Sequence, residues 1–240
     1  MSTRPDPLVL RQLPIFDRLG DHLVRKLIGS CSARQYRAGT FIVRAGEPLH
    51  GLHIVVRGIV DLTHVAGDDE CGVLLLSARD LLLPATTLFR EPALVSARAL
   101  TTTRVITIDG ATTQQALTQS TVFATNLMKA VSGQWRMAVR NILDLNCRSA
   151  AQRLGAFLLR IADLQPGSGA AVLPIPKRHL AIRLGMTAET LSRMLQVVAN
   201  HGLYLRGRTI IIRDRAAIEE FCGPDPYPEK DERTLDVFAL

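Results

Sequence analysis

Residues 177–214 read KRHLAIRLGMTAETLSRMLQVVANHGLYLRGRTIIIRD and carry the strongest structural signal in the chain. Apolar residues at helical spacing predict one helix that ends at Gly185 and a second that Thr187 caps and Gly202 ends. Two helices joined by a short turn that contains glycine form a helix-turn-helix. The remaining residues predict two strands joined at residues 206–208, which is a β-wing, and Asp214 as the cap of a final short helix.

Polar side chains project from the first turns of the second helix, at Glu189, Ser192 and Arg193. In a helix-turn-helix, the second helix lies in the major groove of DNA with its N-terminal residues at base edges. There a guanidinium pairs with guanine O6 and N7, a carboxylate accepts from cytosine N4, and a hydroxyl contacts a base. A surface ion pair between Glu189 and Arg193, four residues apart, is the plainer alternative. It does not account for the preceding helix, the turn and the wing, so we interpret the three residues as readers of double-stranded DNA.

Basic residues are concentrated around this motif. Residues 147–222 hold eleven Lys and Arg against five Asp and Glu, a net charge of +6, whereas residues 1–146 carry +4 and residues 223–240 carry −3. A polyanion is the natural partner of such a surface, and phosphate contacts supply affinity without sequence information. The candidate phosphate contacts are Lys177, Arg178, Thr187, Thr190, Arg206 and Arg208.

A long helix is predicted over residues 111–145, with an apolar heptad seam along it. The seam residues alternate in steps of four and three: Ala124, Met128, Val131, Trp135, Ala138, Ile142 and Leu145. The stripe either packs on the chain's own β-domain or pairs with a second copy; we favour a parallel dimer helix, with Gln134, Asn141 and Arg140 beside the seam to fix its register. Ser149 and Gln152 then form a capping-box pattern that begins a new helix, so residues 146–148 are the predicted hinge.

The N-terminal half has a different residue pattern, with short helical turns followed by short strands. Residues 8–30 predict short helical turns, with Asp21 as a cap, and residues 31–109 predict short strands separated by glycine and proline, as in a small β-barrel or β-roll. The class is therefore α+β. We expect a sensor domain over residues 1–110, a dimerisation helix over 111–146, a winged helix-turn-helix domain over 147–222 and a mobile acidic tail over 223–240.

Several function classes are disfavoured. No run of about 18 apolar residues and no secretory leader is present, so we expect a cytoplasmic protein without a membrane contact. Cys31, Cys71, Cys147 and Cys222 are widely spaced, which predicts buried reduced thiols rather than a local metal site. No paired carboxylates or nucleophile–base pattern predicts an enzyme.

With these parts in order, residues 11–222 resemble the CRP/FNR family of bacterial transcription regulators. The stretch AGTFIVRAGEPLHGLHIVVRGIVDL, residues 38–62, is similar to the family's cyclic-nucleotide-binding-type β-roll, and AETLSRML, residues 188–195, to the reading helix of the FNR branch. The resemblance implies a homodimer that binds a TTGAT-like inverted repeat and contacts RNA polymerase. It also implies control by a small effector that acts through the dimer helix.

The effector region departs from the cyclic-AMP-binding members. Pro84-Ala85 stands where they carry Gly-Glu, and Ala93-Leu94 falls where they carry Arg-Ser or Arg-Thr. A phosphate in an apolar slot without a cation would lose its hydration uncompensated, so we predict no cyclic nucleotide binding. The candidate effector pocket is apolar with one cation nearby: Leu83, Pro84, Ala85, Leu88 and Arg98.

The cysteine and histidine positions bear on two further kinds of sensor, an iron–sulfur cluster and a haem. The FNR iron–sulfur cluster needs clustered N-terminal cysteines, which this chain lacks, so that cluster is not expected. The spacing through residues 79–110 resembles the nitric-oxide-responsive branch, whose members are linked to haem. Any histidine of this half can ligate haem iron, although surface or hydrogen-bonded roles are the plainer interpretation: His22, His50, His53 and His64. The alternatives are a regulator without an effector, one controlled by cysteine oxidation, and a cyclic-nucleotide-binding regulatory module.

Overall fold

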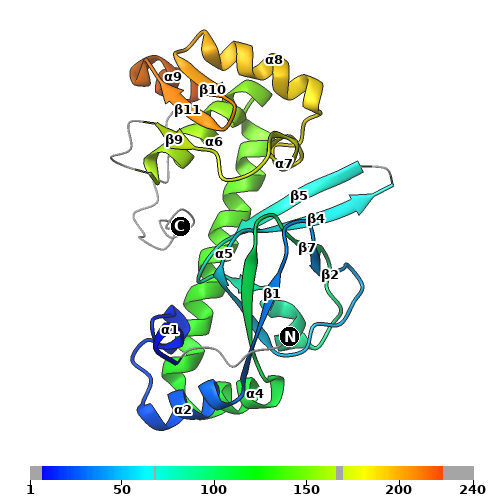
Figure 1. The fold of residues 1–240 in the computed structure, drawn as a ribbon, viewed down its shortest axis with the longest axis vertical. Coiled ribbons are helices and arrows are strands. Elements are labelled where there is room, and N and C mark those ends of the chain that lie inside the picture. The colour runs from blue at the N-terminus through cyan, green and yellow to red at the C-terminus, as the bar shows by residue number, and fades with distance from the viewer. Residues whose placement is uncertain (1–6, 68, 166–169, 224–240) are drawn as a thin grey trace. The chain divides into compact units, whose positions relative to one another are not determined.

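The computed structural model describes residues 7–67, 69–165 and 170–223 (Figure 1). The chain divides into two compact units. Of the described residues, the first unit comprises 7–65 and 73–138, and the second comprises 66–67, 69–72, 139–165 and 170–223. The division falls between residues 138 and 139, inside the longest helix. The predicted acidic tail lies outside the described residues from residue 224 onward.

The first unit opens with three short helices, α1 (Pro7–Arg11), the 3-10 helix η1 (Pro14–Phe16) and α2 (Asp21–Gly29). Leu10 and Leu27 are fully buried and join the core beneath the first sheet. The prediction that Asp21 caps α2 is wrong: Gly20 is the N-cap, without a side-chain bond, and Asp21 is the first helical residue. Its carboxylate is stabilised by the positive N-terminal end of the helix dipole. It also accepts a hydrogen bond from Arg11 Nη2 at 2.8 Å.

Two four-stranded sheets form the predicted β-roll. One has the order β1-β8-β3-β6 and the other β2-β7-β4-β5. The strands are β1 (Cys31–Tyr36), β2 (Phe41–Val43), β3 (Leu52–Arg57), β4 (Val60–Ala66), β5 (Asp69–Leu76), β6 (Leu81–Leu82), β7 (Ser96–Ala99) and β8 (Thr103–Ile108). One apolar cluster gathers around Ile54 and Ile106 of the first sheet. The other gathers around Val60 and Leu76 of the second sheet and includes Val55 and Leu82 from the first. The N-terminal half therefore holds two adjoining cores.

A glycine turn positions the short helix α3 (Pro84–Phe89) against the first sheet. Gly51 has φ +87°, and a β-carbon there would lie 2.4 Å from the carbonyl oxygen of Ile108, so glycine is required. The Gly51 carbonyl accepts hydrogen bonds from His53 Nδ1 at 2.8 Å and from Thr87 Oγ1 at 2.5 Å. This one carbonyl thus joins β3 to α3.

The helix predicted over residues 111–145 is two helices, α4 (Gly110–Gln119) and α5 (Thr121–Cys147). The break falls at Ser120, whose hydroxyl accepts a hydrogen bond from the Phe123 N–H at 3.2 Å. Such a bond satisfies one of the N–H groups that lack a partner at a helix start. At its other end α5 continues through residues 146 and 147. Of the predicted hinge, only Arg148 lies outside a helix.

The second unit is built around α6 (Ala150–Asp163), which packs against α8 (Ala188–Ala199) and α9 (Arg215–Cys222). Ser149 and Gln152 form the predicted capping box, with both reciprocal bonds present. The other elements are α7 (Lys177–Arg183), β9 (Ala171–Val172), β10 (Leu203–Arg206) and β11 (Thr209–Ile212). The strands form a sheet in the order β10-β11-β9, which includes the predicted wing.

Candidate nucleic-acid interface

The turn between α7 and α8 has a defined backbone geometry. Gly185 adopts φ +63°, its N–H donates to the Ile182 carbonyl at 3.2 Å, and the Met186 N–H donates to the Ala181 carbonyl at 3.0 Å. This pair of bonds is the Schellman motif, in which glycine satisfies the last carbonyls of a helix. Thr187 then caps α8, because its hydroxyl accepts from the Thr190 N–H at 3.1 Å. The predicted helix-turn-helix is confirmed down to its capping bonds.

The two faces of α8 have opposite surroundings. Leu191 and Val198, seven residues apart, are buried against the unit's core. The predicted base-reading residues, Glu189, Ser192 and Arg193, are all exposed. The structure therefore brings the three together on the solvent side of the helix.

Local bonds shape this outer face. The Ser192 hydroxyl donates to the Ala188 carbonyl at 3.0 Å, and Arg193 Nη2 donates to Thr190 Oγ1 at 3.4 Å. Within the described part of the chain, Glu189 and Arg193 form no ion pair with each other, so the mutual support allowed by their spacing is absent. Both charged ends remain open to a ligand.

Sequence reasoning missed one residue of this face. Gln196 is exposed, three positions after Arg193 and seven after Glu189, and so continues the same helical row. A glutamine amide can pair with adenine N6 and N7. The spacing from Glu189 and Arg193 is the sequence signal that could have found Gln196.

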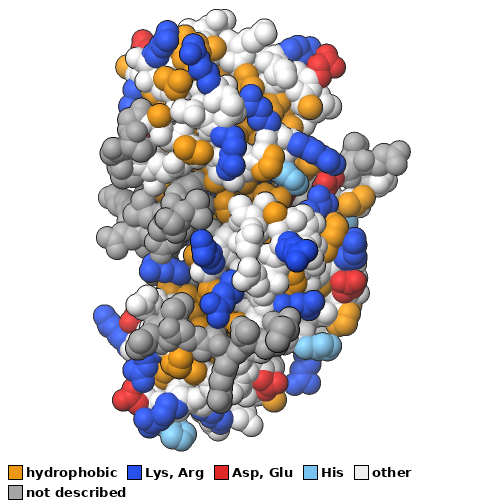
Figure 2. Space-filling view, in the orientation of Figure 1, with side chains coloured by type: hydrophobic (Ala, Val, Ile, Leu, Met, Phe, Trp, Pro, Cys, Tyr) orange, Lys and Arg blue, Asp and Glu red, His pale blue; other side chains and the backbone are white. Residues whose placement is uncertain are grey.

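The predicted phosphate-contacting residues lie on three elements of the second unit: the start of α7, the start of α8 and the wing turn. Lys177 and Arg178 are exposed at the start of α7, and Arg206 and Arg208 are exposed on either side of the wing turn. Figure 2 shows Lys and Arg side chains recurring over the part of the molecule that these elements form. Arg208 is partly committed, since its Nε donates to the Leu173 carbonyl at 2.8 Å and ties the wing to the segment before α7.

The two threonines predicted to contact phosphate are linked by a hydrogen bond. The Thr187 hydroxyl donates to Thr190 Oγ1 at 3.0 Å, and Arg193 donates to the same oxygen. Both threonine hydroxyls are thus engaged at the start of α8, and their contact with phosphate stays a prediction.

An apolar ridge runs along α5. Met128, Trp135 and Ile142, spaced seven residues apart, are 68%, 66% and 52% exposed, and Leu145 is 44% exposed. Of the ten exposed large hydrophobic residues in the described chain, six lie on α5. Such a concentration marks an interaction surface rather than scattered surface residues.

The other predicted seam residues have different surroundings. Ala124, Val131 and Ala138 are half-buried, and Val131 and Ala138 pack against the cores of the first unit. Gln134 Nε2 donates to the Leu81 carbonyl at 2.6 Å. The seam thus divides, because Val131 and Ala138 serve the chain's own cores, and Gln134 binds the backbone of the same chain.

The candidate effector residues are spread over both cores. Leu83 packs against the core of the second sheet, and Leu88 packs against that of the first. Pro84 begins α3, and Ala85 is exposed. The Arg98 guanidinium stacks over the Phe41 ring at 4.5 Å, and Arg98 lies opposite Asp61 in the β4–β7 ladder. Its charge is therefore engaged in the sheet.

The histidines and cysteines are also separated. His22, His50 and His64 are exposed, whereas His53 is buried, and burial lowers its pKa from 6.5. Burial raises the pKa of the Cys31 thiol to about 12 and that of Cys222 to about 11, which disfavours the reactive thiolates. The prediction of buried thiols is thus confirmed for Cys31 and Cys222 and wrong for Cys71 and Cys147, which are exposed. Over the residues that the structure describes, no three His, Cys, Asp or Glu side chains gather as metal ligands would.

Every helix in the described ranges is too short or too polar to cross a lipid bilayer.

Comparison with known proteins assigns both halves of the chain. Residues 152–221 match the family model of the Crp-like helix-turn-helix domain, and residues 33–120 match that of the cyclic nucleotide-binding domain. Over 99 residues the chain is 32% identical to the nitrogen fixation regulation protein FixK of Rhizobium meliloti. The matched segment is 40% of this chain and 46% of FixK, so it spans less than half of that protein's length. Over 210 residues it is 26% identical to the cyclic AMP receptor protein of Thermus thermophilus. This match covers 86% of this chain and 95% of the receptor.

A solved structure shares the fold. FixK2 from Bradyrhizobium japonicum matches with a TM-score of 0.71 and 24% identity, over 81% of this chain and 98% of that one.

Proposed function

Because the chain belongs to the CRP/FNR family of transcription regulators, we propose that it acts as a homodimer that recognises a TTGAT-like inverted repeat in double-stranded DNA. The family consists of DNA-binding regulators that act as dimers, not of enzymes. The observation that carries the proposal is the outward row on α8, where Glu189, Ser192 and Arg193 are exposed while Leu191 is buried beneath them.

The row supplies the donors and acceptors that base edges require. Arg193 pairs with guanine O6 and N7 in the half-site, and Glu189 accepts from the cytosine N4 amino group of the complementary strand. Ser192 contacts the neighbouring base pair. The basic residues at the start of α7 and in the wing hold the phosphates on either side and fix the register.

Dimerisation occurs along α5. Met128, Trp135 and Ile142 form one edge of a heptad repeat and bury their exposed area against the same residues of a second copy. Such pairing is isologous, so the two reading helices are related by a two-fold axis. That symmetry explains why the DNA site is an inverted repeat with half-sites about 34 Å apart.

Control comes from a small effector other than cyclic AMP that binds near the β-roll. The effector shifts the population between two packings of the paired α5 helices, and so sets the spacing of the reading helices. Similarity to FixK, a nitrogen fixation regulation protein, supports a role in the regulation of nitrogen metabolism. Haem and nitric oxide are the first effectors to test. RNA polymerase is the expected protein partner at the promoter.

Fluorescence anisotropy with labelled duplexes tests the proposal. The full chain is titrated onto a TTGAT–ATCAA inverted repeat and onto a scrambled duplex of the same composition, with and without haem, nitric oxide and cyclic AMP. We expect the repeat to bind at least about a thousandfold more tightly than the scrambled duplex at physiological salt in the activated state. Equal affinity for both duplexes under all conditions would overturn the assignment of α8 as a sequence reader.

A further inference from the structure

Arg153, in the first turn of α6, binds the ends of two other helices. Its Nε donates to the carbonyl of Leu184, the C-cap residue of α7, at 3.2 Å. Its Nη1 donates to the carbonyl of Arg148, directly after α5, at 2.9 Å and to that of Leu145, in the last turn of α5, at 3.5 Å. Carbonyls at helix C-termini lack intrahelical partners and favour a cation. One guanidinium thus joins the end of α5 to the turn that precedes the reading helix.

Apolar packing reinforces the same connection. Gly185, the glycine of the helix-turn-helix turn, faces α5, and a β-carbon built there would lie 3.3 Å from Leu145 Cδ2. Leu145 therefore contributes its side chain to the turn and its carbonyl to Arg153. The position of the turn relative to the end of α5 is therefore fixed twice, by the Leu145–Gly185 contact and by the hydrogen bonds of Arg153.

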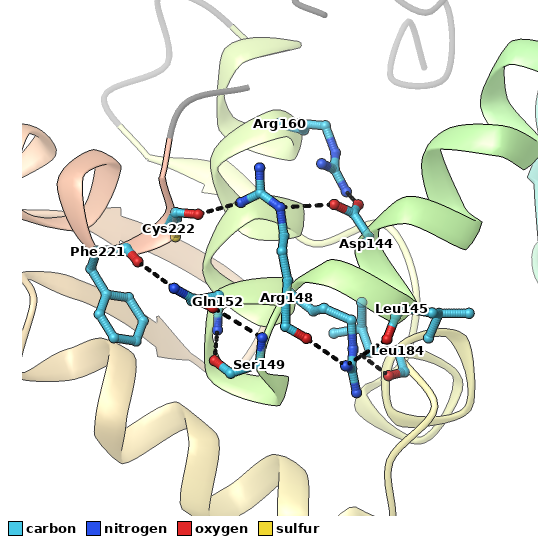
Figure 3. A network of polar contacts seen from close by, with 10 residues as sticks. Asp144, Leu145, Arg148, Ser149, Gln152, Arg160, Leu184, Phe221 and Cys222 are labelled. Carbon is cyan, nitrogen blue, oxygen red and sulfur yellow. Dashed lines mark hydrogen bonds and ion pairs between the residues drawn. The ribbon is translucent and has the colours of Figure 1, made fainter. Parts of the chain in front are cut away.

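Neighbouring residues of the α5–α6 junction hold α9 in the same manner. Arg148 Nη1 donates to the Cys222 carbonyl at 2.6 Å, and Gln152 Nε2 donates to the Phe221 carbonyl at 3.1 Å (Figure 3). Asp144 in turn holds Arg148 Nε at 3.0 Å and Arg160 Nη2 at 2.7 Å, with only 13% of its own side chain exposed. The junction is therefore a set of partly buried bonds, most of them donated by guanidinium groups, which resist bending more than a solvated linker does.

This rigidity bears on how far apart two reading helices lie. Ile142 and Leu145 belong to the apolar ridge of α5, and they lie in the same compact unit as α8. If the ridge pairs with a second copy, the path from the two-fold axis to each reading helix runs through the end of α5, Arg153 and the turn at Leu184. A change in any of these links moves the reading helix relative to the axis.

We propose that Arg153 is a positioning residue that sets the half-site spacing the dimer accepts; this inference rests on the proposed function. A guanidinium presents its donors in a rigid fork, so it fixes both the separation and the relative orientation of the helix ends it binds. A lysine ammonium is a point charge on a flexible stem and fixes neither. Spacing selectivity, rather than base selectivity, is the property that Arg153 controls.

The test compares affinities for three duplexes that carry the same half-sites. One has the preferred spacing, and the others have one base pair inserted or removed between the half-sites. One base pair shifts and rotates a half-site by about one tenth of a helical turn, so we expect wild-type affinity to fall by about tenfold or more. In Arg153→Ala we expect the ratio between spacings to shrink to within about threefold. Arg153→Lys should give an intermediate ratio, and it provides a second measurement if the alanine variant does not fold.

Two matched variants separate positioning from general weakening. Arg215→Ala removes a guanidinium of the same unit that pairs with Asp163 at 2.7 Å and Glu219 at 2.6 Å, away from the α5–α6 junction. Arg206→Ala removes a predicted phosphate contact. Both should keep the wild-type ratio between spacings, even where absolute affinity falls.

The outcomes are distinct. In one, Arg153 variants bind all three duplexes more weakly than wild type while the ratios of affinity between the spacings stay at their wild-type values. That result would overturn the positioning role and leave the proposed function standing. A wild-type chain that does not prefer the inverted repeat to scrambled DNA would overturn the proposed function and this inference together.

Discussion

Gly155 on α6 lies so close to Cys222 on α9 that a β-carbon built on the glycine would be 2.5 Å from the cysteine Sγ. The same β-carbon would lie 3.2 Å from Ile218 Cδ1 and 3.7 Å from Val198 Cγ1, which belongs to the reading helix. The absence of a side chain at this position lets α8 and α9 approach the central helix together. The packing beneath the reading helix therefore depends on one glycine.

Gly155→Ala should consequently destabilise the second unit. Overpacking of a filled core costs about 1–3 kcal/mol, more than the gain in helix propensity returns. Urea unfolding followed by circular dichroism measures the loss. The control is Gly133→Ala on α5, where a built β-carbon meets nothing within 4 Å, and that variant should be neutral or slightly stabilised. A Gly155→Ala variant as stable as Gly133→Ala would contradict the described packing.

Replacement of Arg193 by Ala tests the reading helix directly. We expect a loss of about 1–3 kcal/mol in discrimination at the guanine of the half-site, because the bidentate contact is removed. Binding to sites with each of the four bases at that position measures the effect. Arg215→Ala makes the same change of charge on α9 and should leave the base preference intact. An unchanged preference in Arg193→Ala would show that this face does not read the guanine.

Trp135→Glu should separate the dimer. Trp135 is 66% exposed at the middle of the apolar ridge, and a tryptophan at the centre of an interface typically contributes at least about 2 kcal/mol. Analytical ultracentrifugation over a range of protein concentrations gives the dissociation constant. Leu94→Glu places the same charge on a residue that is 80% exposed outside α5, and it should leave the dimer intact. Equal dissociation constants for wild type and Trp135→Glu would rule out this ridge as the interface.

His53 should make stability depend on pH. Burial lowers its pKa in the folded state, while the Gly51 hydrogen bond opposes that shift less strongly. The unfolded chain therefore binds a proton near pH 6.5 that the folded chain does not bind until the pH is lower. The free energy of unfolding is at its full value above pH 6.5 and falls as the pH drops below it, by at most about 1.4 kcal/mol per pH unit.

Urea unfolding between pH 7.5 and pH 5 measures this dependence. His53→Gln should show a flatter profile over that range, since the titrating group is gone. His22→Gln, on an exposed position of α2, serves as the control and should keep the wild-type profile. A wild-type free energy that rises on acidification through this range would contradict the buried, neutral state of His53.

Cyclic AMP should not bind with useful affinity. Pro84 begins α3 without an N–H to offer a phosphate, and Arg98 is stacked on Phe41 within the sheet. Isothermal titration calorimetry of the full chain with cyclic AMP should show no saturable heat at millimolar ligand. Saturable binding of one nucleotide per chain would contradict this prediction and support the alternative that the chain is a cyclic-nucleotide-binding regulatory module.

The sequence by itself determined the elements whose signals are local. Thr187, Ser149 and Asp214 cap their helices as their spacing predicts, because a capping side chain binds an N–H only two or three residues away. The helix-turn-helix, the wing and the exposed row on α8 follow from caps, glycines and periodicity inside some forty residues. Asp21 and Ser120 show the limit, since either residue type can begin a helix and only the surrounding structure selects which does.

The tertiary structure alone decided how those elements meet. A heptad pattern states that a helix has an apolar stripe, but not whether the chain's own core or a partner covers it, so Val131 and Met128 could not be told apart beforehand. Arg153 gave no signal in the sequence, because its acceptor at Leu184 is 31 residues distant. Side-chain bonds between distant segments depend on where the folded backbone places both groups, and a local pattern does not contain that information.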